Sequence, residues 1–217
     1  MAPAGSFESL AAALQGGADS VYFGIGKLNM RSRATANFAE EDLPEIVARC
    51  HETGAKAYLT LNIIVYDEEL ETVRNLCAAA KAAGVDAVIA SDLAVITHAH
   101  SIGLEVHMSV QANVCNMASV RFYAQYADVV VLARELTLGQ IRRIIDGIRD
   151  EGIRGPSGDL IRVEIFAHGA LCVAVSGKGH MSRAAYNSSA NRGACFQNCR
   201  RAYRVTDEET GNELVID

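Results

Sequence analysis

Two stretches of sequence decide the fold class: EVHMSVQAN, residues Glu105–Asn113, and IRVEIFAH, residues Ile161–His168. In both stretches, polar and apolar residues alternate, as they do along a strand that has one polar and one apolar face. The more polar face of the two stretches carries Glu105, His107, Ser109, Gln111 and Asn113, then Arg162, Glu164, Phe166 and His168. A doubly wound sheet is apolar on both faces, whereas barrel active sites gather polar groups at the carboxyl ends of the strands. The pattern therefore favours a barrel.

Strand-like and helix-like segments alternate along the chain, which is typical of parallel strands joined by crossover helices. The other predicted strands are Ser20–Gly24, Ala57–Asn62, Ala87–Ser91 and Val129–Ala133. The predicted helices are Glu40–Glu52, Asp67–Ala83, Leu93–Ile102, Ala118–Tyr126 and Thr137–Gly152. A complete barrel needs eight strands. We therefore expect a TIM-barrel-like (β/α) barrel that is open or truncated, with a strand stub at Met1–Gly5.

The expected organisation has two parts. Residues 1–170 form the barrel portion, and residues 171–217 form a cysteine-bearing loop segment packed on it. The chain stops at Glu213–Asp217, within what reads as the middle of an element. We therefore expect the second part to continue into a further C-terminal portion.

Composition narrows the setting in which the protein works. The chain has 217 residues, is 50% hydrophobic and carries a formal net charge of −6. It lacks an apolar run of about 18 residues, the minimum for a membrane span, and its N-terminus does not have the pattern of a signal peptide. We therefore expect a cytoplasmic protein without membrane contact. We therefore interpret its six cysteines as reduced thiols or metal ligands in preference to disulfides.

Three of these cysteines, Cys172, Cys195 and Cys199, lie in the loop-rich stretch Glu164–Tyr203. Clustered thiols on loops are typical of iron–sulfur centres, with a zinc site or buried free thiols as alternatives. Cys50 and Cys77 fall on the apolar stripes of predicted helices and are expected in the core. We expect a structural role for Cys115 as well.

Residues Lys178–Arg204 form a basic span, with six basic residues and no acidic one. Because the whole chain carries −6, the remainder carries −12. A local basic patch on an acidic protein favours a polyanion such as RNA, and Tyr186, Phe196 and Tyr203 could stack on bases. The predicted substrate contacts in this span are Arg192, Arg200 and Arg201. The alternative is that some of its arginines neutralise thiolates or pair with barrel carboxylates.

A polar pocket is predicted near the carboxyl ends of the strands. Arg31 and Arg33 alternate in a loop and could clamp a carboxylate or phosphate, which a dicarboxylate would suit. The predicted catalytic residues are Arg31, Arg33, Glu164 and His168, and the remaining substrate contacts are Asn62, Gln111, Asn113 and Glu135. The alternative is a set of salt bridges between loops.

Several motifs resemble the U-32 family of collagenase-like peptidases. The most specific is HGALC (168–172), followed by NRGAC (191–195) and Cys199-Arg200, and APAGSF (2–7) and SVQANVCN (109–116) extend the resemblance over nearly the whole chain. The resemblance implies a [4Fe–4S] cluster held by cysteines. It also implies hydroxylation of a pyrimidine in transfer or ribosomal RNA with prephenate as an oxygen source, or the related hydroxylation in ubiquinone synthesis.

One position departs from the family pattern, which has a cysteine where this chain has Gly179. The cluster then has three matched ligands, Cys172, Cys195 and Cys199, with His180 as a possible fourth, and it could be incomplete. The favoured function is cluster-dependent RNA hydroxylation by an enzyme. The alternatives are a collagenase-like peptidase, although no protease motif is present, and a non-catalytic RNA-binding or assembly module.

Overall fold

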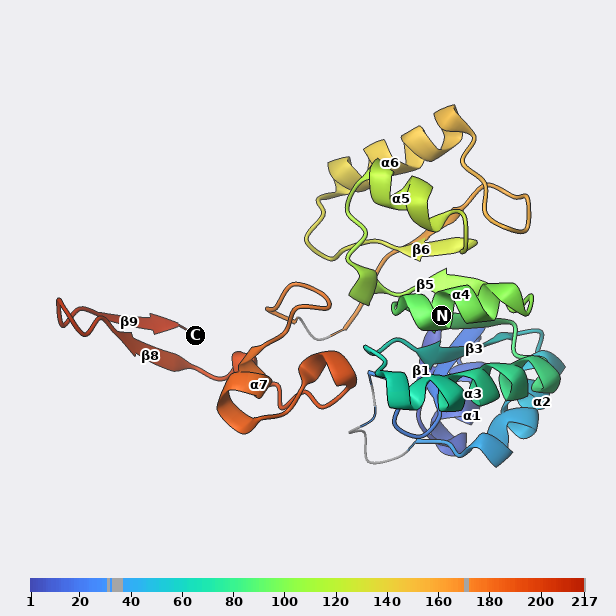
Figure 1. Ribbon diagram of the computed structural model, residues 1–217, viewed down its shortest axis with the longest axis horizontal. Helices are drawn as coiled ribbons and strands as arrows, with labels where there is room; N and C mark the ends of the chain where they lie inside the picture. Colours follow the sequence, from blue (N-terminus) through green and yellow to red (C-terminus); the bar gives the residue numbers. More distant parts are fainter. Residues whose placement is uncertain (31, 33–36, 170–171, 217) are drawn as a thin grey trace.

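The computed structural model describes residues 1–30, 32, 37–169 and 172–216. Seven parallel strands form one sheet in chain order, β1-β2-β3-β4-β5-β6-β7, which curls into an open half-barrel (Figure 1). The strands are β1 (Ala2–Ala4), β2 (Ser20–Gly24), β3 (Lys56–Leu61), β4 (Ala87–Ala90), β5 (Val106–Met108), β6 (Val129–Val131) and β7 (Arg162–Glu164). The predicted open TIM-barrel-like α/β fold is confirmed, and the stub at the N-terminus is a true strand that pairs with β2.

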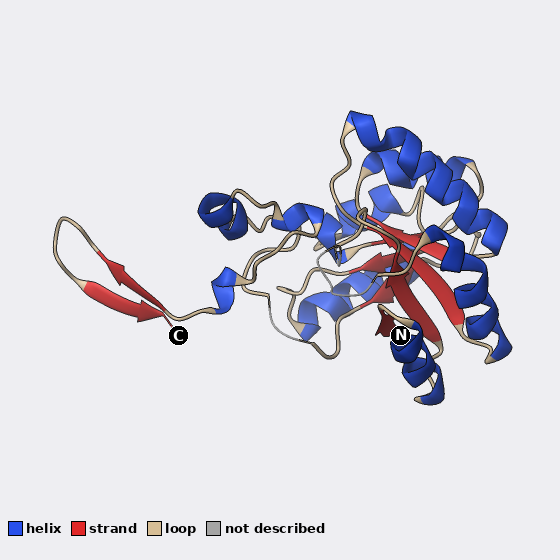
Figure 2. Cartoon of the chain, turned by 90° about the horizontal axis from the view of Figure 1, so that it is seen from below, coloured by secondary structure: helices blue, strands red, loops and turns tan. Residues whose placement is uncertain are grey.

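Helices connect successive strands and lie along the outer side of the sheet (Figure 2). They are α1 (Phe7–Gln15), α2 (Leu43–Glu52), α3 (Leu70–Ala83), α4 (Leu93–Ser101), α5 (Met117–Tyr123) and α6 (Leu138–Glu151). Local sequence explains their ends. Thr137 and Gln140 form a capping box at the start of α6, and Gly84 ends α3 at a φ of 81°, a left-handed conformation that glycine adopts without strain.

The two faces of the sheet have different surroundings, as the alternation in β5 predicts. Val106 and Met108 belong to the apolar core between the sheet and the helices. His107 lies on the other face, where its Nε2 is 2.9 Å from Glu105 Oε1. Glu105, which directly precedes β5, also accepts a hydrogen bond from Arg162 of β7 at 2.7 Å. This bond links the two polar side chains across β6, the strand that lies between them.

Beyond β7 the chain forms what we call the cysteine segment, residues 172–202. It contains one short helix, α7 (Met181–Tyr186), and 3-10 turns at Ala190–Arg192 and Asn198–Arg200. An antiparallel hairpin, β8 (Tyr203–Thr206) and β9 (Glu213–Ile216), then extends away from the half-barrel (Figure 1). The division of the chain near residue 170 into two parts stays a prediction. No helix in the described part of the chain is long and apolar enough to cross a membrane.

The structure adds elements that the sequence patterns did not indicate. Helix α1 and the β8–β9 hairpin were not predicted, and α5 ends at Tyr123 rather than Tyr126. Cys50 and Cys77 are fully buried, as expected, and burial raises the pKa of each to about 11. Cys115 is exposed, so the structural role that we expected for it has no support in its surroundings.

The apolar layer between sheet and helices makes a direct prediction about stability. Leu59 on β3 is 0% exposed, whereas Leu138 at the start of α6 is 79% exposed. We expect Leu59→Ala to lower the free energy of unfolding by about 2–5 kcal/mol, because it leaves a cavity in a packed core. Leu138→Ala is the control and should change it by less than about 0.5 kcal/mol. Urea denaturation measures both, and equal effects would contradict the described core.

Candidate functional site

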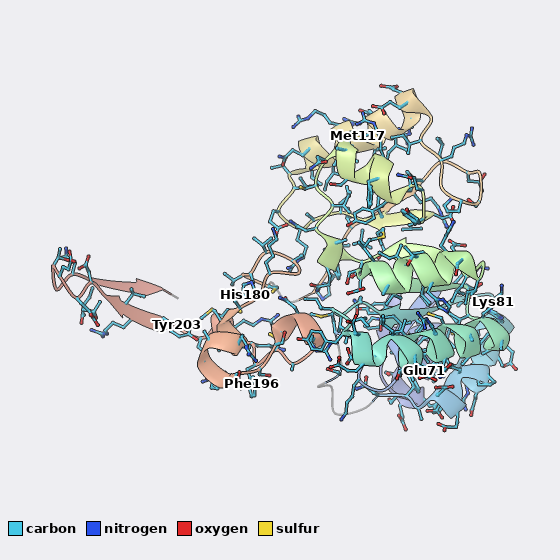
Figure 3. All side chains as sticks on the ribbon, in the orientation of Figure 1. Glu71, Lys81, Met117, His180, Phe196 and Tyr203 are labelled. Atoms are coloured by element: carbon cyan, nitrogen blue, oxygen red, sulfur yellow. The ribbon has the colours of Figure 1, made fainter. Side chains whose placement is uncertain are left out.

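Three thiols from two separate parts of the cysteine segment face one cavity. Cys172, Cys195 and Cys199 all line a space of about 90 Å³, together with His180 and Gly179. Figure 3 labels His180 in this segment, beside the half-barrel. All three cysteines are partly buried. The structure therefore brings together all four residues that were predicted as metal ligands.

Glycine and buried polar groups shape the wall of this cavity. Gly177 has a φ of 72°, and a Cβ there would lie 2.3 Å from the carbonyl oxygen of Gln111, so only glycine fits. Asn191 Oδ1 accepts a hydrogen bond from the backbone N–H of Gly179 at 3.2 Å. The N–H of Gln197 donates to Cys195 Sγ at 3.4 Å. Hydrogen bonds to sulfur are among the means by which proteins tune iron–sulfur centres.

Arg134, which follows β6, holds the first cysteine loop. Its Nε and Nη2 donate to Ser176 Oγ at 3.1 and 2.9 Å. Its Nη2 also donates to the carbonyl of Ala174 at 3.2 Å, and Nη1 to that of Cys172 at 3.5 Å. Arg134 lines the cavity as well, and none of the described residues that line it is acidic. Arg134 therefore places a positive charge in the wall beside the three thiols.

Arg192 holds the second part of the cysteine segment against the barrel. It forms a bidentate ion pair with Glu69, at 2.8 and 2.5 Å, and donates to the carbonyl of Ile64 at 2.6 Å. Its guanidinium also lies 4.0 Å from the ring centre of Tyr66. This is the carboxylate pairing that we gave as the alternative for the arginines of the basic span. Arg192 pairs with Glu69 in this way, and its role as a substrate contact stays a prediction.

The positions of the described ligands bear on whether one metal ion could be held here. A zinc site needs ligands that converge on one point at about 2.0–2.3 Å. Among the described residues, no three His, Cys, Asp or Glu side chains are placed to share one metal ion. The ligands of an iron–sulfur cluster attach to separate iron atoms, so thiols spread around one cavity suit it. Cys172, Cys195 and Cys199 all line the same cavity.

Gly179 stands at the edge of the thiol set with room for a side chain. A Cβ built there would lie 3.4 Å from Ala190 Cβ, 3.7 Å from Ala174 Cβ and 3.9 Å from Asn191 Oδ1. These are ordinary van der Waals contacts, and the φ of Gly179 is not positive. A cysteine at this position would therefore fit the backbone, which matches the family pattern.

A second cavity of about 110 Å³ adjoins the first and shares Gln111, Gly177 and Asn191 with it. Asn62 lines it from the end of β3, and its Nδ2 donates to Ser109 Oγ at 3.3 Å while its Oδ1 accepts from the N–H of Met30 at 3.1 Å. Two of the predicted substrate contacts, Asn62 and Gln111, thus meet at the carboxyl ends of the strands.

The remaining predicted residues are more scattered. Glu164 ends β7, and burial raises the pKa of its carboxyl, against a lowering influence from His107. His168 and Glu135 are exposed, and neither lines either cavity. Asn113 has a φ of 54°, and its buried Oδ1 lacks a partner among the described residues. Arg200 and Arg201 are exposed, and Arg31 and Arg33 lie outside the described residues.

Residues that sequence reasoning missed include Arg134, Ser176, Ser182 and Asn191. Ser182 is buried, and its Oγ accepts a hydrogen bond from the N–H of Phe196 at 3.0 Å. Arg134 lies about forty positions before the loop that it holds. Local periodicity carries no signal for a contact between residues so far apart in the chain.

The fold and site together define a class of protein: open (β/α) barrels with a thiol-lined cavity at the carboxyl ends of their strands. Residues 5–215 match the profile of Peptidase family U32, and the chain belongs to this family. It is 54% identical over 217 residues to a protein of Porphyromonas gingivalis named "Collagenase", covering 100% of this chain and 52% of the relative.

Other relatives carry names from RNA modification. The "23S rRNA 5-hydroxycytidine C2501 synthase" of Escherichia coli is 37% identical, over 89% of this chain and 28% of the relative. The "tRNA hydroxylation protein P" of Escherichia coli is 34% identical, over 98% of this chain and 46% of the relative. The chain spans about half the length of the curated relatives to which it is most similar.

A solved structure supports the fold. The U32 peptidase Mk0906 superposes with a TM-score of 0.53 at 14% identity, over 78% of this chain and 92% of that one. At this identity the likeness shows the fold alone.

The contacts of Arg134 predict its effect on order in the cysteine segment. We expect Arg134→Ala to speed amide hydrogen exchange of residues 172–177 about tenfold or more, because charged hydrogen bonds to the loop contribute about 1.5–3 kcal/mol each. Arg142→Ala, on an exposed position of α6, is the control. Unchanged exchange in Arg134→Ala would show that the loop is held by other contacts.

The ion pair of Glu69 and Arg192 predicts a pH dependence. The hydrogen bonds from Arg192 lower the pKa of the Glu69 carboxyl, so the pair stabilises the fold above the usual glutamate pKa, about 4.3, and the effect disappears as pH falls through the lowered value. We expect Glu69→Gln to cost about 1–2 kcal/mol of unfolding free energy at pH 7. This cost should shrink below about pH 4. Urea denaturation at several pH values measures it, and a cost that does not change with pH would argue against an ionic origin.

Proposed function

We propose that this chain is the cluster-bearing portion of an enzyme that hydroxylates a pyrimidine in transfer or ribosomal RNA. The observation that supports this most strongly is the cavity lined by Cys172, Cys195 and Cys199 together with Arg134, in which none of the described lining residues is acidic. The names of two relatives, a tRNA hydroxylation protein and a 23S rRNA 5-hydroxycytidine synthase, supply the reaction and the substrate class.

In this proposal the three cysteines hold a [4Fe–4S] cluster, which supplies electron transfer when it is bound. The residues of this chain position it. Arg134 fixes the loop of Cys172 and places positive charge beside the thiolates. Arg192 and Glu69 keep the loop that leads to Cys195 and Cys199 against the barrel.

The substrate would occupy the polar mouth of the half-barrel. Asn62 and Gln111 line the cavity that adjoins the thiols and offer amide groups to a base or to a small carboxylate such as prephenate, the proposed oxygen source. Glu164, whose carboxyl pKa is raised by burial, remains a proposed catalytic residue. Asn113, Glu135, His168, Arg31 and Arg33 remain proposed contacts.

Anaerobic purification followed by iron and sulfide analysis tests the cluster. We expect roughly four irons and four sulfides per chain, with broad absorption near 400 nm. Cys195→Ala should lose most of the iron, because a cluster ligand is removed. Cys115→Ala is the matched control, since Cys115 is exposed and does not line the cavity. An iron-free wild-type protein would overturn the cluster and with it the proposed chemistry.

Two further variants locate the fourth ligand. Gly179→Cys should make the cluster more resistant to oxygen, because the new thiol fits beside Ala190 and Ala174. His180→Ala should labilise the cluster if His180 is the fourth ligand and leave it unchanged otherwise. Time courses of bleaching in air, compared with the wild type, separate these cases.

Peptidase activity is a second candidate, favoured by the 54% identity to a protein named collagenase. His168 does not line the cavity that Cys172 faces, which gives no support to a Cys–His pair. Hydrolysis of gelatin that is lost on Cys172→Ala but kept in Cys195→Ala would favour this function over a cluster. RNA binding without turnover would favour a binding or assembly module.

A further inference from the structure

Two aromatic rings lie side by side at the end of α7. The ring centres of Tyr186 and Phe196 are 4.7 Å apart, with 36° between their planes. Both are on the surface, 46% and 40% exposed respectively, and Figure 3 labels Phe196 beside this helix. Exposed rings that lie side by side are apolar surface that a binding partner can cover.

Hydrogen bonds to two buried side chains hold the backbone of Phe196 in place. The N–H of Phe196 donates to Ser182 Oγ at 3.0 Å, and Ser182 Oγ donates to Asn198 Oδ1 at 3.2 Å. Ser182 and Asn198 are 2% and 4% exposed. A surface that is ordered before binding loses less conformational entropy when a ligand arrives.

The third aromatic residue of the basic span has a different role. The hydroxyl of Tyr203 donates to the carbonyl of Asn198 at 2.5 Å. Tyr203 therefore tightens the turn that carries Cys199, and only Tyr186 and Phe196 offer a paired surface.

The aromatic pair lies within the most basic part of the molecule. Lys178, Arg183, Arg200 and Arg201 are exposed, and Arg200 donates a hydrogen bond to Gln197 Oε1 at 3.0 Å. Arg204 pairs with Glu213 and Arg192 with Glu69. No acidic residue occurs between positions 178 and 204, in a chain whose remainder carries −12. Positive charge around stacked rings is the combination that binds single-stranded nucleic acid.

The pair also adjoins the thiol cavity. Phe196 follows Cys195, and Ser182, which holds Phe196, lines the cavity itself. We propose that Tyr186 and Phe196 form a stacking platform for an unpaired base of RNA, next to the cavity where that base or its neighbour would react. This inference rests on the proposed RNA substrate, and it assigns Tyr186 and Phe196 as the surface that binds the RNA.

The test is binding of the whole chain to a fluorescein-labelled, pyrimidine-rich single-stranded RNA, followed by fluorescence anisotropy at several salt concentrations. We expect Phe196→Ala and Tyr186→Ala each to weaken binding about tenfold or more, since base stacking on aromatic rings contributes strongly to such complexes. Tyr186→Phe should keep the wild-type affinity, because the ring remains. The slope of affinity against salt should stay the same in all three, because phosphate contacts are unchanged.

Phe122→Ala is the matched control, because this ring on α5 is 48% exposed but lies outside the basic span. Circular dichroism melts establish that each variant is folded. Wild-type binding that persists in both alanine variants would overturn the platform while leaving an RNA substrate in place. Failure of the wild type to bind RNA, or tighter binding to a gelatin peptide, would overturn the platform and the RNA function together, whatever the iron content.

Discussion

The parallel register of the sheet is the constraint on which the site depends. Seven strands that run in one direction and in chain order bring all their carboxyl ends to the same edge. Asn62 after β3, Gln111 after β5 and Arg134 after β6 therefore meet there, although they are far apart in sequence. The cysteine segment returns to this edge and is fastened by Arg134 and Arg192. Without the common direction of the strands, neither cavity would exist.

The six cysteines divide into groups with different chemistry. Cys50 and Cys77 lie inside the apolar layer, where burial keeps them as protonated thiols. Cys172, Cys195 and Cys199 lie at the surface of a polar segment, beside Arg134 and backbone N–H groups. Thiolates are the form that binds metals. The location of each cysteine therefore distinguishes the two groups: those in the apolar layer pack the core, and those in the cysteine segment are candidate ligands.

Much of the fold could be predicted from sequence because strand alternation and helix caps are local signals. The polar face of Glu105–Asn113 indicated the barrel, and Thr137 marked the start of α6. Helix α1 was missed although Ser6, which caps its start, is a local signal. The grouping of the cysteines could be predicted from their motifs. The contacts of Arg134 and the pairing of Arg192 with Glu69 could not be predicted, because each contact joins residues far apart in the chain.

The order of the strands also has a consequence for how the protein is made. Each strand from β2 onward pairs with the strand that precedes it in the chain. A ribosome that releases the chain from its N-terminus therefore delivers every strand to a partner that is already present. The half-barrel can therefore grow by one strand and one connecting segment at a time. The cysteine segment follows all seven strands in the chain, so its thiols reach the edge of the sheet after those strands have been made.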